Sequence, residues 1–313
     1  MSEHLRHHYV PQCYLKYFGN IKNNSGKRKK KYFLYAINTK NRQPFSISIE
    51  DACQIKNFYS LSDETLAHDR SLDALTIECG IFAEKIEYRY SELLQTLYAK
   101  KEKALSLNDN AIALSSHEKE ELAYYIAIQH LRMPQYRERI MNITRDGYPR
   151  LMQVFKHLVA NVENDPQIAN IELSYKYDEA LIHGETGFLN PTFIHPIVTK
   201  LNNGTWLFAY SPAKDISTSN NPMVSFSAND GYPSPIFWRS SIVYFPLFPD
   251  ILLIILPKEY SDFKDCTFAE IQDFAYTSFH NYLTVQSTEI YNYNNNFDKI
   301  IAFLNGQTKN EKR

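Results

Sequence analysis

Two adjacent histidines near the start of the chain are the residues best suited to chemistry. His7 and His8 stand before Val10 and Pro11, ahead of an aromatic run that ends at Phe18. Imidazole can bind a metal ion or move a proton near neutral pH. Because proline disfavours a helical residue before it, we expect a rigid, extended segment whose two histidines face opposite sides. We predict that they are catalytic; the alternative is a buried pair that ties the terminus to the core.

A second candidate group lies at the end of an expected helix. Gln129 and Arg132 share one helix face, and His130 lies on another. The guanidinium of Arg132 is a rigid fork that suits phosphate or carboxylate, so Arg132 and Gln129 are predicted to hold a phosphate-bearing substrate. The alternative is an arginine paired with an acid of the chain. His130 and Glu78 are further catalytic candidates, although most helix glutamates are merely exposed.

A polar turn before a proline is the third candidate. Ser219, Asn220 and Asn221 precede Pro222, and short polar side chains at such positions make tight turns. These turns also expose backbone N–H groups that can hold an anion. We therefore predict that this turn binds substrate together with Gln12; the alternative is a connector between two strands.

The same segments resemble the domain of unknown function 4238 family. The opening His-His-Tyr-Val-Pro-Gln-x-Tyr-Leu-x-x-Phe is similar to the start of that family. Four further segments resemble its Asn-Phe-Tyr, Gln-His-x-Arg-x-Pro, Thr-Ser-Asp-Asn-Pro-Val and Pro-Leu-x-Pro motifs in the expected order: Asn57–Leu61, Gln129–Pro134, Thr218–Val224 and Phe245–Pro249.

What this resemblance implies is a biological role more than a chemistry. The family has no settled activity, and its bacterial members resemble single-gene anti-phage defence proteins. Asn220 departs from the pattern, which has Asp at this position. If that Asp bound a metal ion, its replacement weakens a metal-dependent mechanism; the resemblance leaves the cofactor unknown, with a divalent metal as one option.

Composition excludes several classes of protein. The 313 residues carry a net charge of -1, so no global basic field attracts nucleic acid, and any such contact must be local. The lysine-rich run 27–31 is either a phosphate contact or a solvated loop. With 9 glycines and no Walker, dinucleotide or nucleophile-elbow motif, kinases, P-loop NTPases and Rossmann dehydrogenases are not indicated.

Cysteine spacing and hydropathy indicate the compartment. Cys13, Cys53, Cys79 and Cys266 are scattered without Cys-x-x-Cys spacing, which argues against a zinc or disulfide framework. No signal region opens the chain, and the most apolar stretch, 242–256, is interrupted and too short to span a bilayer. We expect a soluble, cytoplasmic protein without a membrane partner.

The element pattern predicts an α+β fold. In the amino-terminal half we expect a hairpin and three helices, over Tyr32–Ile37, Phe45–Ile49, Ser71–Lys103, Ser115 to Pro134 and Tyr148–Val162. From Ile168 we expect strands of a mainly antiparallel sheet, clearest at Trp206–Tyr210, Met223–Phe226 and Ile242–Leu256, then a helix over Thr267–Tyr282. We predict one domain over residues 1–305, or intimate sub-domains 1–165 and 166–305, and a flexible tail over 306–313.

Imidazole, guanidinium and a polar turn together suit a phosphate-centred reaction. We therefore expect a His-dependent nuclease that cleaves RNA or DNA, in which the three segments share one cleft. A sensor that binds a phage component is the rival hypothesis, because aromatic residues are enriched at recognition surfaces. Hydrolysis of a small nucleotide such as NAD is a third. The sequence does not indicate an oligomeric state.

Overall fold

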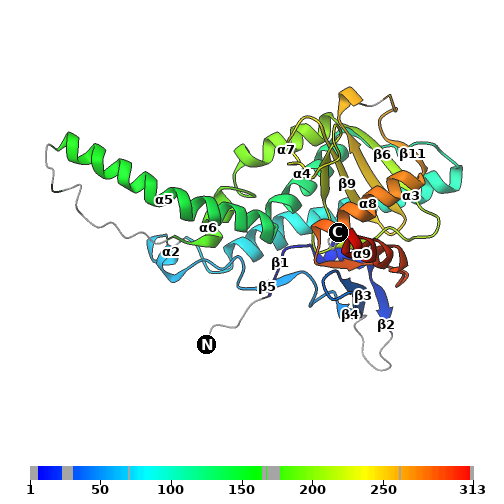
Figure 1. Ribbon diagram of the computed structural model, residues 1–313, viewed down its shortest axis with the longest axis horizontal. Helices are drawn as coiled ribbons and strands as arrows, with labels where there is room; N and C mark the ends of the chain where they lie inside the picture. Colours follow the sequence, from blue (N-terminus) through cyan, green and yellow to red (C-terminus); the bar gives the residue numbers. More distant parts are fainter. Residues whose placement is uncertain are drawn as a thin grey trace.

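The computed structural model describes residues 6–22, 31–69, 71–163, 167, 177–260 and 262–310. The predicted α+β class is confirmed: helices dominate the amino-terminal half and an antiparallel sheet the carboxyl-terminal half. Figure 1 shows a body in which these parts are packed together and one long helix that projects from it.

The amino-terminal segment is anchored between two small sheets. The predicted hairpin is confirmed, and its first strand also pairs with the strand before it in the chain, Asn20–Lys22, and with the distant strand Glu289–Tyr291. These elements are β1 (Arg6–His8), α1 (Gln12–Leu15), η1 (Lys16–Phe18), β2 (Asn20–Lys22), β3 (Lys31–Asn38), β4 (Pro44–Ser48), β5 (Gln54–Lys56), β7 (Thr218–Ser219) and β12 (Glu289–Tyr291). The lysine-rich run lies outside the described residues except for Lys31.

The helix predicted over Ser71–Lys103 is wrong at its start, over residues 71–75, and differs in type as far as Glu87. Residues 71–75 form turns, η2 (Thr76–Glu87) is a π-helix, and only α3 (Tyr88–Leu107) is an α-helix. The buried residues of η2 are Ile77, Phe82 and Ile86, at spacings of five and four. Such spacings place side chains on one side of a helix with i→i+5 hydrogen bonds, so burial of this face selects the wider turn.

The next helix begins where local signals predict, and the one after it begins fourteen residues earlier than predicted. Ser115 caps α4 (Ser116–Leu131) in a capping box with Glu118, as the sequence indicates. Pro134 ends that run and is the first residue of α5 (Pro134–Val162), where its missing N–H has no cost. The helix predicted at Tyr148–Val162 is therefore part of a much longer one, and α5 is the projecting helix of Figure 1.

The carboxyl-terminal half is built on a five-stranded sheet in the order β11-β6-β10-β9-β8. Its three predicted strand regions are confirmed, and all pairs are antiparallel except β11 with β6. The strands are β6 (Thr205–Tyr210), β8 (Val224–Ser227), β9 (Ser241–Phe248), β10 (Ile251–Leu256) and β11 (Thr267–Glu270).

Two predictions in this half are wrong. Strands were expected throughout from Ile168, but residues 179–185 and 191–203 are helical, because Asp178 and Asn190 cap two helix starts. The helix predicted from Thr267 begins only after Gln272, because residues 267–270 pair with β6. The remaining helices are α2 (Asp63–His68), α6 (Glu179–Glu185), α7 (Pro191–Asn203), η4 (Lys258–Tyr260), α8 (Asp273–Gln286) and α9 (Asp298–Asn310).

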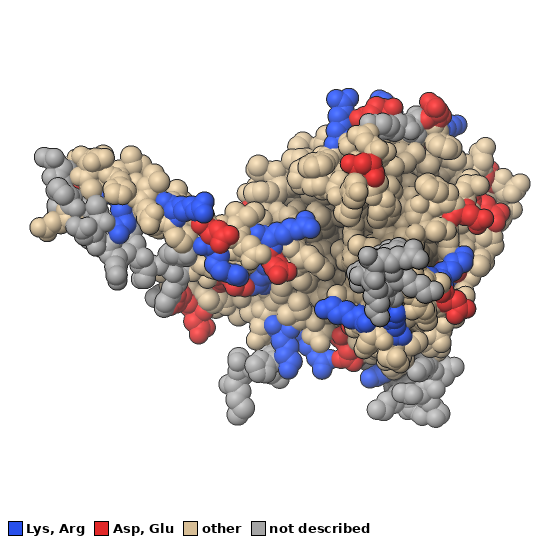
Figure 2. All heavy atoms as spheres, in the orientation of Figure 1, with Lys and Arg blue, Asp and Glu red and all other residues tan. Residues whose placement is uncertain are grey.

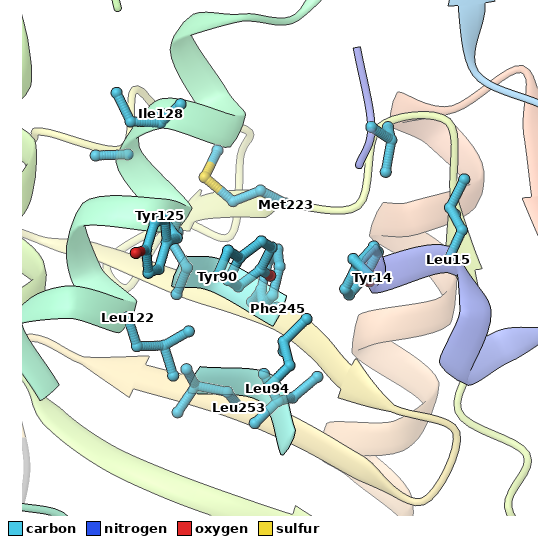
Figure 3. Packing of buried hydrophobic residues seen from close by; sticks show 14 of the residues in the cluster. Tyr14, Leu15, Tyr90, Leu94, Leu122, Tyr125, Ile128, Met223, Phe245 and Leu253 are labelled. Atoms are coloured by element: carbon cyan, nitrogen blue, oxygen red, sulfur yellow. The ribbon is translucent and has the colours of Figure 1, made fainter. Parts of the chain in front are cut away.

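The core joins the first residues of the chain to the main sheet. Figure 3 shows Tyr14 and Leu15 of α1, Tyr90 and Leu94 of α3, and Leu122 of α4 packed above strand residues. The buried hydroxyl of Tyr14 lies 2.6 Å from the carbonyl of Pro246 and 2.7 Å from the hydroxyl of Thr218. The histidine segment is thereby fixed relative to the sheet.

Two further findings concern the whole described chain. Within the described residues, no helix combines the length and the apolar character needed to cross a membrane. The four cysteines are free thiols. The chain remains helical to Asn310, inside the tail predicted to be flexible, and residues 311–313 lie outside the described part.

Candidate functional site

The histidine strand has one edge in a sheet and the other bound by side chains. On its first edge, His8 of β1 pairs with Gln54 of β5. On the second, the backbone N–H of His8 donates to the carboxyl group of Glu78, and its carbonyl oxygen accepts from Arg132. The amide of Gln129 donates to the carbonyl of Tyr9 at 2.9 Å. Candidates from β1, η2 and the end of α4 therefore converge.

The geometry of η2 explains why two of its carboxylates reach this strand. Glu78 contacts His8, and Glu87 lies 3.1 Å from the guanidinium of Arg132. Nine residues make two and a half turns of an α-helix, which would place these side chains on opposite sides. At about 4.4 residues per turn, a π-helix brings positions nine apart to the same side.

The ring of His8 contacts two neighbouring residues, and 8% of the residue surface remains exposed. Its Nε2 lies 3.2 Å from the carbonyl oxygen of Glu50, and the amide of Gln12 lies 3.3 Å from the ring nitrogens. If Nε2 donates to this carbonyl, Nδ1 is the acceptor that faces Gln12. Burial lowers the pKa of His8 below its usual value of 6.5, so the ring is neutral at pH 7 and can accept a proton.

Glu78 complements this neutral imidazole. Burial raises the pKa of its carboxyl group to about 7, and the positive charge of Arg132 opposes only part of this rise. One carboxyl oxygen has no hydrogen-bond partner among the described residues. A half-buried carboxyl group that titrates near neutrality can donate a proton, and this one accepts the backbone N–H of the residue that carries the neutral imidazole.

Arg132 is fully buried and its guanidinium is already bound. It pairs with Glu87, donates to the carbonyl oxygen of His8 and lies 4.0 Å above the ring of Phe82. Although burial lowers the pKa of Arg132, Tyr59 and Glu87 raise it above its usual range. This geometry corresponds to the acid-paired alternative, and it makes Arg132 a residue that positions the histidine strand.

His7 faces the opposite side of β1, as alternation along a strand requires. Its Nδ1 accepts the N–H of Tyr59 at 2.8 Å, and its ring stacks on Tyr59 with an interplanar angle of 6°. Burial, and then the neighbouring His8, lower the pKa of His7 to about 4. With 1% of its surface exposed, His7 lies in the core.

Two other histidines lie around the same core. The ring of His130 packs edge-on against Tyr136, and burial lowers its pKa to about 4. His183, which no sequence signal marked, lies 2.8 Å from the carbonyl of Leu131 and beside the ring of Tyr59. Burial lowers its pKa to about 3. Tyr59 thus contacts both His7 and His183; its Asn-Phe-Tyr segment was the signal that could have found it.

The polar turn is occupied by contacts with the strand region beside it. Asn220 accepts the N–H groups of Thr288 and Glu289 at 3.1 and 3.2 Å, and donates to the hydroxyl of Thr288 at 2.7 Å. Ser219 accepts from the hydroxyl of Ser287 at 2.8 Å, and Asn221 donates to a backbone carbonyl at 3.3 Å. These contacts fit the connector alternative.

The polar turn does contact the histidine segment, but at Tyr9, the residue after His8. The hydroxyl of Tyr9 hydrogen-bonds with Asn220 and with the thiol of Cys53. Since His8 contacts Gln12 and Glu78 instead, the turn and the acid–base pair lie against different residues of the same segment.

The described residues offer neither a cluster of metal ligands nor, on the face drawn in Figure 2, a strongly charged surface as a further candidate site. Among the described residues, no group of three or more His, Cys, Asp or Glu side chains is placed to hold a metal ion. Figure 2 shows Lys and Arg mixed with Asp and Glu on this face, which agrees with the net charge of -1. Chemistry at His8 would depend on local contacts.

Comparison with known proteins places the chain in a single group. A family model described as "Protein of unknown function (DUF4238)" matches residues 6–300. No curated protein and no solved structure matches the chain.

Proposed function

The chain belongs to the DUF4238 family, whose function is unknown, and we propose that it is a metal-independent ribonuclease. The observation that carries this proposal is the contact between Glu78 and His8. The carboxyl group, whose pKa is about 7, accepts the backbone N–H of the residue that carries the neutral imidazole, and it is partly buried. Such a pair supplies the base and the acid that phosphodiester cleavage requires.

The acid and base pair suits RNA because the ribose carries its own nucleophile. His8 takes the proton of a 2′-hydroxyl, whose oxygen attacks the neighbouring phosphorus. Glu78 gives its proton to the leaving 5′-oxygen. The products are a 2′,3′-cyclic phosphate and a 5′-hydroxyl end, so atoms and charge balance without a metal ion. An adjacent nucleophile also removes the entropy cost of bringing water to the phosphate.

The other residues of the cluster hold this pair in place. Arg132 binds the carbonyl of His8 and the carboxylate of Glu87, which fixes the strand against η2. Gln12 contacts the His8 ring from the first turn of α1 and is partly exposed. It would therefore orient the base and meet the substrate.

Cleavage of labelled RNA in the presence of chelator tests the proposal. We expect wild-type protein to release 2′,3′-cyclic phosphate ends, and His8→Ala or Glu78→Gln to lower kcat by about 10²- to 10⁴-fold. His117→Ala, at an exposed position on α4, is the matched control and should cleave normally. Folded His8→Ala protein with full activity would contradict the assignment, as would cleavage of DNA or NAD but not RNA.

We further propose that this activity serves anti-phage defence, because bacterial members of the family resemble defence proteins. Phage plaque counts on bacteria that express each variant test this role. His8→Ala should remove protection while His117→Ala retains it. Protection by the inactive variant would instead support the sensor hypothesis.

A further inference from the structure

The projecting helix α5 carries an apolar stripe. Ile143, Leu151, Val154, Phe155 and Leu158 are each more than half exposed. At 100° per residue these positions fall within about 120° of the helix circumference, which makes them one face. The buried residues of α5, Met141 and Ala160, lie outside this face. We call Ile143–Val162 the arm; it is about 30 Å long.

The arm is also basic. Arg150 borders the apolar stripe, whereas Arg145 and Lys156 lie on the far side of the helix, and these three cations stand against one carboxylate of the arm, Asp146. No acidic residue occurs between Gly147 and Val162. Figure 2 shows Lys and Arg side chains along the arm. An exposed apolar stripe on a helix of net positive charge suits an occupant that is apolar and carries negative charge nearby.

The body of the same chain contains a groove of that kind. Two adjoining cavities of about 970 and 410 Å³ lie along α4, and they share Arg89, His117 and Glu121 as lining residues. The larger one runs between η2, α4 and α7, and Tyr124, Phe188 and Ile194 contribute to its apolar lining. We call the two cavities together the α4 groove.

The rim of the α4 groove has an excess of negative charge. Glu84, Glu120 and Glu121 line the larger cavity, and Glu92 and Glu118 line the smaller one. The lysine and arginine side chains of the lining are Lys85 and Arg89. Five carboxylates against two lysine or arginine cations therefore surround an apolar floor, which complements the arm in both respects.

We propose that the arm of one molecule docks in the α4 groove of a second copy. Because each molecule has one arm and one groove, two molecules that exchange arms form a closed pair with twofold symmetry. Direct pairing of two arms is less favourable, because it would bring together two helices of net positive charge, each with Arg150 beside its stripe and no carboxylate between Gly147 and Val162. The groove supplies the carboxylates that a second arm lacks.

Charge reversal on each partner tests the exchange. The arm variant combines Arg150→Glu with Lys156→Glu, and the groove variant combines Glu84→Lys with Glu120→Lys; all four positions are at least partly exposed, so the fold should survive. Sedimentation velocity of the full chain should show a concentration-dependent dimer for the wild type. Each variant alone should dissociate at least about tenfold more readily.

The mixture of the two variants gives the decisive result. Its heterodimer contains one acidic arm in a basic groove and one basic arm in an acidic groove, so association should return to within about threefold of wild type. Three outcomes would overturn the proposal: a monomeric wild type up to about 100 μM, a groove variant that dimerises normally, which indicates arm–arm pairing, or a monomer whose arm binds vesicles of anionic lipid.

Discussion

Polar side chains are usually exposed and large apolar ones usually buried, and two regions of this molecule depart from that rule. The histidine cluster buries polar groups, and the arm exposes apolar ones. Around β1, charged and polar side chains are buried, and Arg132 has a bonding partner on two sides. On α5, large apolar side chains such as Leu151 and Leu158 are exposed. In the first region most polar groups find partners within one chain and so fix positions, although Glu78, His7 and Arg132 each keep one buried oxygen or nitrogen without a hydrogen-bond partner among the described residues. The second is complete only with an occupant.

Removing one side of the buried ion pair should have the largest effect on stability. Arg132→Ala leaves the Glu87 carboxylate and the His8 carbonyl without their partner. We expect the free energy of unfolding to fall by about 3–5 kcal/mol, as for other broken buried pairs. Urea unfolding followed by fluorescence measures the loss.

Two companion variants sharpen this prediction. Arg139→Ala removes an exposed arginine of α5 and should change stability by no more than about 0.5 kcal/mol. Arg132→Met combined with Glu87→Leu removes both charges and should be more stable than Arg132→Ala. If the double variant is the less stable one, the guanidinium is not held mainly by Glu87.

Matched leucines compare the two regions directly. Leu122 of α4 is fully buried in the core, and Leu158 of the arm is 58% exposed. Leu122→Ala should cost about 2–5 kcal/mol through lost burial and a cavity, and Leu158→Ala less than about 0.5 kcal/mol in dilute solution. Chemical denaturation of both variants checks this. An equally large loss at Leu158 would mean that the arm is already packed within its own chain.

Local signals were sufficient where the chain decides its structure locally. The capping box of Ser115, the hairpin strands and the break at Pro134 depend on neighbouring residues, and all were predictable. Thr267 looks like a helix cap, but pairing with β6 makes it the start of a strand. That outcome depends on residues sixty positions away in the chain, as tertiary contacts often override propensity.

The sequence indicates several residues of the candidate site but not which side chains contact one another. The alternation of His7 and His8 follows from the extended backbone, and the structure places them on opposite sides of β1. The partner of Arg132 could not be found, because an α-helical period puts Glu87 and Glu78 on opposite faces. Only the wider turn of η2 brings both to β1. A pitch change of this kind has no simple sequence signature.

Low pH should destabilise the protein through its buried histidines His7 and His183. The pKa values of His7 and His183 are about 4 and about 3 in the folded chain, against 6.5 without burial. Because the folded chain binds these protons more weakly than the unfolded chain, stability falls as pH drops below 6.5, down to the folded pKa values. Each histidine should remove about 2 kcal/mol between pH 6.5 and 5.

The slope of stability against pH isolates one histidine. His183→Phe should cost stability at pH 7 through its lost contact with the Leu131 carbonyl, but its urea midpoint should depend less on pH than that of the wild type. His117→Gln on the surface is the control and should leave the slope unchanged. An unaltered slope in His183→Phe would show that His183 is not the buried neutral group.

The last prediction concerns Glu78, whose contribution to the free energy of unfolding has the opposite pH dependence to that of the buried histidines. Because its folded pKa of about 7 lies above the ordinary 4.5, the folded chain holds this proton more tightly, and stability falls as pH rises from about 4.5 to about 7. Glu78→Gln, whose amide oxygen can still accept the N–H of His8, avoids this loss. Thermal unfolding should show little difference at pH 4.5 and a variant more stable by up to about 3 kcal/mol at pH 8. The same substitution should strongly lower the rate of RNA cleavage. A gain in stability together with this loss of activity would indicate that the proton held by Glu78 is the one used in catalysis. Equal stability at both pH values would mean that Glu78 is solvated, and the acid of the proposed reaction would have to come from another group.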